Sequence, residues 1–73
     1  MPGDCNEAFE MTGYGKTEKE ARENAKENAE TACKDNIQCS HAHYVKRVKI
    51  RPPHGEEKDW EFVGQYTCGA TID

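Results

Sequence analysis

The side chains with the greatest capacity for chemistry are four cysteines, Cys5, Cys33, Cys39 and Cys68. Cysteines pair as disulfides in oxidising compartments, whereas reduced thiolates act as metal ligands or nucleophiles. An even cysteine count in a chain of 73 residues is typical of a disulfide framework. The count therefore predicts two disulfides and an exported protein, either secreted or periplasmic.

A second possibility is a metal site within Cys39-Ser40-His41-Ala42-His43. Alternate side chains of an extended strand point the same way, so Cys39, His41 and His43 would share one face. Thiolate and imidazole together suit zinc or copper. This metal-binding alternative requires a reduced Cys39, because an oxidised Cys39 leaves only two histidines on a solvated strand face. A site made of all four cysteines is a second form of this alternative and would need a reducing compartment. Apart from these metal sites, we expect no cofactor.

The elements that must position these groups follow from the hydrophobic pattern. Residues 8–14 predict a strand with Phe9 and Met11 on one face. The sequence Thr-Glu-Lys-Glu at 17–20 matches a capping box, which predicts that a helix begins there. The helix is expected to run to about Lys34, with small side chains at helical spacing on its buried face, namely Ala21, Ala25, Ala29, Ala32 and Cys33.

Two longer alternating segments follow the helix and predict a hairpin. Strand 40–51 would present one face made of Ala42, Tyr44, Val48 and Ile50 and another made of His41, His43, Val45, Arg47, Lys49 and Arg51. Strand 60–72 would present to the core Trp60, Phe62, Gly64, Tyr66, Cys68, Ala70 and Ile72. The segment 52–59 between them contains two prolines and a glycine, which end strand pairing and predict a solvated loop.

This order of elements predicts one α+β domain over residues 1–73, a βαββ fold in which one helix packs on one face of a three-stranded antiparallel sheet. We expect the first strand to lie beside the third. All four cysteines would then meet at one end of the molecule. Three pairings are possible, and because Cys33 and Cys68 share the helix-facing phase, we favour Cys33–Cys68 with Cys5–Cys39.

The sheet face that the helix leaves uncovered is the predicted binding surface. It would carry Arg47, Lys49 and Arg51, with His54 in the adjoining loop. Loops held between rigid strands often carry recognition residues, so we expect a protein partner or self-association through this face and the loop. Single-stranded nucleic acid is a further alternative for a basic sheet face, but the net charge of -4 argues against it.

The order of strand, alanine-rich helix, strand and strand resembles the dodecin-like βαββ modules. The final segment Gly64-Gln65-Tyr66-Thr67-Cys68-Gly69-Ala70-Thr71-Ile72 is similar to the disulfide-bonded domain of the outer-membrane lipoprotein that senses envelope stress for the Rcs phosphorelay. This resemblance implies an envelope protein that works by contact with other proteins and not by catalysis.

The composition favours a binding module over an enzyme or a membrane protein. The chain is 34% hydrophobic and 33% charged, and it has no apolar run near the ~20 residues that a membrane-spanning helix needs. Its start lacks the features of a signal peptide, so an exported chain would be in its mature form. Its single serine, Ser40, has no matching base, so we expect no catalytic residues.

Overall fold

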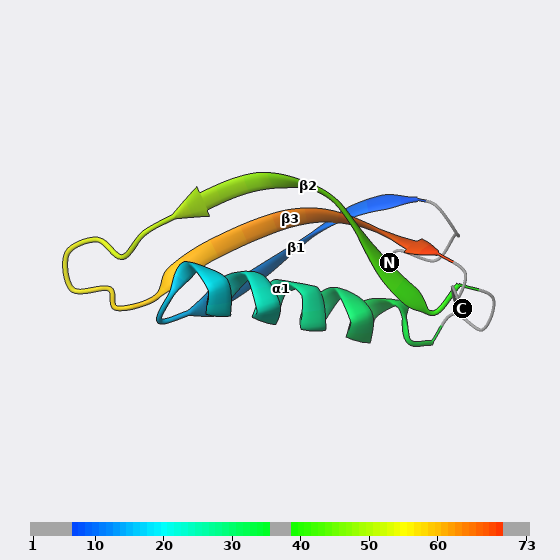
Figure 1. Cartoon of the computed structure of the whole chain (residues 1–73), viewed down its shortest axis with the longest axis horizontal. Coiled ribbons are helices and arrows are strands. Elements are labelled where there is room, and N and C mark those ends of the chain that lie inside the picture. Colours follow the sequence, from blue (N-terminus) through cyan, green and yellow to red (C-terminus); the bar gives the residue numbers. More distant parts are fainter. Residues whose placement is uncertain (1–6, 36–38, 70–73) are drawn as a thin grey trace.

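The computed structural model describes residues 7–35 and 39–69 and confirms the predicted fold. Four elements follow one another: β1 (Ala8–Gly15), α1 (Glu18–Cys33), β2 (His41–Arg51) and β3 (Trp60–Gly69). The three strands form one antiparallel sheet in the order β1-β3-β2, as expected. Figure 1 shows α1 running along one side of this sheet and the 52–59 loop at the far end of the β2–β3 hairpin.

The start of α1 is set by the predicted capping box, with one difference. The Thr17 hydroxyl accepts a hydrogen bond from the Glu20 backbone N–H at 3.1 Å, so Thr17 is the N-cap. The Glu20 carboxylate accepts from the Lys16 N–H at 3.2 Å, one residue before the position that a capping box predicts. Both interactions satisfy backbone donors that the helix itself cannot pair.

Small residues let α1 lie very close to β1. A Cβ at Gly13 would collide with the backbone of Ala21 and Ala25, so only glycine fits there. Two helix side chains also hold the backbone of this strand: Asn28 Nδ2 donates to the Thr12 carbonyl at 2.9 Å, and the Asn24 amide donates to that of Tyr14. The helix therefore covers β1, an edge strand, and blocks pairing there.

The core lies between α1 and β3. Ala21, Ala25, Ala29 and Cys33 of α1 are buried against three β3 side chains, Phe62, Tyr66 and Cys68. Ala32, also expected on this face, is only partly buried. Partly buried apolar side chains complete this layer, namely Phe9, Met11, Ile50 and Trp60. The aromatic residues of the sheet thus supply the volume that the alanine stripe lacks, as the alternation of the third strand predicts.

A disulfide joins Cys33 at the end of α1 to Cys68 near the end of β3, with a Cα–Cα distance of 5.5 Å. This pairing is confirmed. Cys39 is buried and is also disulfide-bonded. The predicted Cys5–Cys39 pairing lies outside the described residues, because Cys5 is not among them.

Strand β2 departs from the predicted alternation. Tyr44 lies opposite Tyr66 and Lys46 opposite Gln65, so a bulge at Val45 shifts the phase. Arg47 then lies opposite Gly64, in the helix-facing phase, and the assignment of Arg47 to the open face is wrong. A second bulge at Val48 restores the original phase, and Lys49 and Arg51 return to the open face as predicted.

Candidate functional site

Of the basic residues predicted to bind a partner, Lys49 and Arg51 form a cluster around Glu61, and Arg47 lies outside it. Arg51 spans two carboxylates: its Nη1 and Nη2 lie 2.6 and 3.1 Å from Glu57, and its Nε lies 3.2 Å from Glu61. Lys49 Nζ also approaches Glu61, at 3.5 Å. Arg51 therefore ties the 52–59 loop to β3, and much of its hydrogen-bonding capacity is used within the molecule.

The ionisation of this cluster follows from the same contacts. Hydrogen bonds from Arg51 lower the pKa of Glu57 and of Glu61 below the ordinary value of 4.5. Hydrogen bonds to Glu57 and then to Glu61 raise the pKa of Arg51 above its ordinary value. His54 is exposed in the same loop as Glu57.

The residues of the metal-binding alternative, two in β2 and Cys39 just before it, lack a thiolate. Cys39 is disulfide-bonded, His41 Nδ1 approaches the Glu30 carboxylate at 3.8 Å, and the His43 ring lies where a Cβ on Gly69 would be. Within residues 7–35 and 39–69, no group of three or more His, Cys, Asp or Glu side chains is placed to hold a metal ion. The oxidised Cys39 removes the ligand on which that hypothesis depends.

The bulges of β2 expose an apolar and cationic surface that the sequence did not predict. Tyr44, Val45 and Val48 are 53%, 49% and 44% exposed, and Lys46 and Arg47 lie between them in the sequence. Neither cation has an ion-pair partner among the described residues. We call these five consecutive residues, 44–48, the β2 patch. The sequence feature that could have indicated this patch is the apolar pair Tyr44-Val45 followed by the cationic pair Lys46-Arg47. Two like residues in a row interrupt the alternation of apolar and polar residues along the strand.

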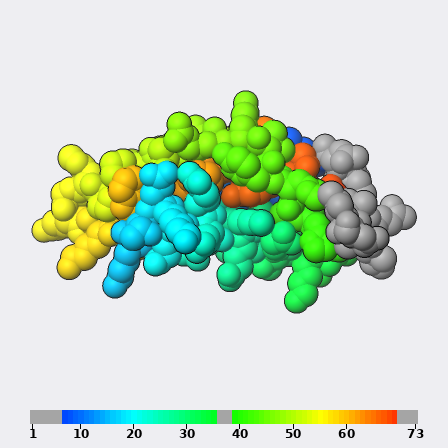
Figure 2. Space-filling view, viewed as in Figure 1, coloured from blue at the N-terminus to red at the C-terminus, as the bar shows by residue number. Residues whose placement is uncertain are grey.

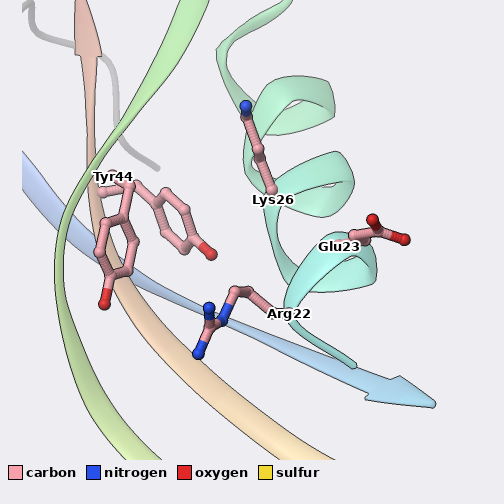
Figure 3. Close-up of a pocket in the computed structure, with 5 residues that line it drawn as sticks. Arg22, Glu23, Lys26 and Tyr44 are labelled. Carbon is pink, nitrogen blue, oxygen red and sulfur yellow. The ribbon is translucent and has the colours of Figure 1, made fainter. Parts of the chain in front are cut away.

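A groove of about 310 Å³ lies between α1 and β2, lined by Arg22, Glu23, Lys26, Tyr44 and Tyr66. In the space-filling view, β3 (orange) is visible between α1 (cyan) and β2 (green) (Figure 2). Figure 3 shows Arg22 extending from α1 toward the strands, while the Glu23 carboxylate points away from Tyr44. The Arg22 guanidinium carbon lies 5.5 Å from the centre of the Phe62 ring, so a cation covers part of the aromatic core.

Tyr66 forms the buried part of this groove. The residue is only 1% exposed, and its hydroxyl has no hydrogen-bond partner in the described structure. Burial raises the pKa of Tyr66, so the hydroxyl remains protonated at neutral pH. The sequence predicts Tyr66 as a core residue, and this is confirmed, but nothing local to it indicates that its hydroxyl would lack a partner.

The comparisons with known proteins found no matching family model, no matching curated protein and no matching solved structure. Among the described residues, no helix has the length and apolar character needed to cross a membrane.

Proposed function

We propose that this chain is an exported, non-enzymatic module that binds an acidic and partly apolar protein surface through the β2 patch. The observation that carries the proposal is the exposure of Tyr44, Val45 and Val48 around the uncompensated charges of Lys46 and Arg47. Aromatic side chains and arginine are enriched at protein interfaces, and grouped exposed apolar side chains often mark them.

The chemistry of the partner follows from charge complementarity. Lys46 and Arg47 follow one another in an edge strand, in opposite phases of it, and both attract acidic groups. The flanking valines and tyrosine gain free energy when apolar side chains cover them. The open sheet face has less positive charge left for an acidic partner, because Lys49 and Arg51 already pair with Glu61 there.

Two further observations support an exported protein that does not act by catalysis. The Cys33–Cys68 disulfide requires an oxidising compartment to persist. Cys33, Cys39 and Cys68 are all disulfide-bonded, so none of the three supplies a thiolate nucleophile.

The test is an NMR titration of the labelled protein with a ten-residue peptide of alternating Glu and Leu. We expect shift changes centred on residues 44–48, weaker at high salt, and a loss of affinity of about tenfold in Val45→Ser/Val48→Ser and in Lys46→Ser/Arg47→Ser. The matched control Lys16→Ser/Lys58→Ser removes the same charge from exposed sites elsewhere and should bind like the parent.

Three results would count against the proposal. A Lys/Leu peptide that binds as well as the Glu/Leu peptide would remove the charge argument. Equal losses in the control variant would assign the effect to net charge and not to the patch. Concentration-dependent dimerisation in sedimentation, abolished by the patch variants, would assign the patch to a second copy of the chain.

A further inference from the structure

The groove between α1 and β2 contains a hydrogen-bond donor that no described residue uses. The Tyr66 hydroxyl is buried and has no partner among residues 7–35 and 39–69. A buried hydroxyl without a partner destabilises the folded protein, so such groups are uncommon unless they have a function. Tyr66 lines this groove together with Arg22 and Tyr44.

Arg22 adds a positive charge beside this hydroxyl. Its Nη2 pairs with Glu18 at 3.1 Å, which leaves its other N–H groups to a ligand. Lys26 lies one helical turn further along the same side of α1 and also lines the groove. The Glu23 carboxylate points away from Tyr44 (Figure 3), so the groove presents donors and positive charge where the tyrosines lie.

The remaining walls are aromatic. The Tyr44 and Tyr66 rings lie 5.8 Å apart in an edge-to-face arrangement, and Tyr44 is half exposed. A ring of a ligand could pack against Tyr44 in the same way. The volume of about 310 Å³ is at the lower end of small-ligand sites, which span roughly 300–1,000 Å³.

We infer that this groove binds a carboxylate that a short chain joins to an aromatic ring. The Tyr66 hydroxyl donates to one carboxylate oxygen, Arg22 donates to the other, and the ligand ring packs against Tyr44. Because the hydroxyl is buried in the free protein, binding requires groove side chains such as the exposed Arg22 to shift. This site does not require the β2 patch to bind a protein, and the two share only Tyr44.

The decisive variant is Tyr66→Phe, which removes one oxygen atom. Binding of 3-phenylpropionate, followed by NMR, should weaken about tenfold, since a hydrogen bond to a charged group is lost. The free variant should be as stable as the parent or more stable, because the hydroxyl has no partner among the residues that the structure describes. A purely structural role for this hydroxyl would instead make the variant less stable.

Two controls keep the result specific. Tyr14→Phe removes a hydroxyl from the open sheet face, where it donates to Glu61, and should bind 3-phenylpropionate like the parent. The neutral 3-phenylpropionamide should bind the parent about tenfold more weakly than the acid, and Arg22→Gln should remove most of that preference.

The same chemistry can come from a free aromatic acid or from a protein that ends in an aromatic residue. N-acetyl-Gly-Phe with a free carboxylate, titrated in parallel, distinguishes them. Tighter binding of this peptide assigns the groove to a protein C-terminus, and tighter binding of 3-phenylpropionate assigns it to a small molecule.

Absence of binding by both probes, or equal binding by parent and Tyr66→Phe, would overturn the inference. Either result would leave the β2 patch untouched, because Val45→Ser/Val48→Ser changes no residue that lines the groove. Failure of one proposal is therefore distinguishable from failure of the other.

Discussion

At the scale of single residues, Arg51 shows how a predicted contact residue can have a structural role. Its guanidinium pairs with Glu57 in the loop and Glu61 in β3, so the loop is held against the sheet. Both carboxylates have a pKa below the ordinary 4.5, with hydrogen bonds from Arg51 as the first cause. Their ionised forms are therefore favoured more in the folded than in the unfolded protein.

This linkage predicts how stability depends on acid. The stabilisation is complete above about pH 4.5 and is lost as the pH falls from there through the lowered pKa values. In Arg51→Gln, the free energy of unfolding, measured in urea between pH 2 and 7, should fall less steeply with acid than in the parent. Arg47→Gln removes an exposed arginine outside this cluster and should keep the parental slope. Identical slopes for all three proteins would contradict the role of Arg51.

At the scale of elements, the close approach of α1 to β1 decides which sheet face is covered. Gly13, Ala21 and Ala25 bring the two backbones together, and Asn24 and Asn28 bind the carbonyls of β1. Because the helix is held over this side of the sheet, the groove remains between α1 and β2.

Substitution of Gly13 tests this packing. Gly13→Ala should lower the free energy of unfolding by about 3 kcal/mol, since the added Cβ meets helix backbone that cannot move independently. Gly55→Ala is the matched control: Gly55 has a φ of 64° and open space around it, so strain alone should cost about 1 kcal/mol. Equal losses in urea denaturation would mean that α1 does not approach β1 this closely.

At the scale of the whole molecule, the two ends are held by different chemistry. The Cys33–Cys68 disulfide links α1 to β3 at one end, and the Arg51 ion pairs hold the loop at the other (Figure 1). A domain of this size buries little surface beyond what offsets its conformational entropy, so a covalent link has a large effect.

Removal of the Cys33–Cys68 disulfide should therefore lower the free energy of unfolding strongly. For a sequence separation of 35 residues, the chain-entropy relation gives a loss of about 4 kcal/mol for Cys33→Ala/Cys68→Ala. Urea denaturation measures this loss directly. Addition of reductant should destabilise the parent more than the variant, and a variant as stable as the oxidised parent would contradict the prediction.

Local patterns were sufficient for the order of elements, the helix cap and the alternation of β3, because periodicity and capping depend on neighbours in the sequence. The Cys33–Cys68 pairing could be favoured over the alternatives only after these elements had been assembled into a fold that brings the two cysteines together. The bulges at Val45 and Val48, the ion pairs of Arg51 and the unpartnered Tyr66 hydroxyl could not be found in this way. Each depends on strand register and on contacts between residues far apart in the chain, which exist only once the helix and hairpin have packed.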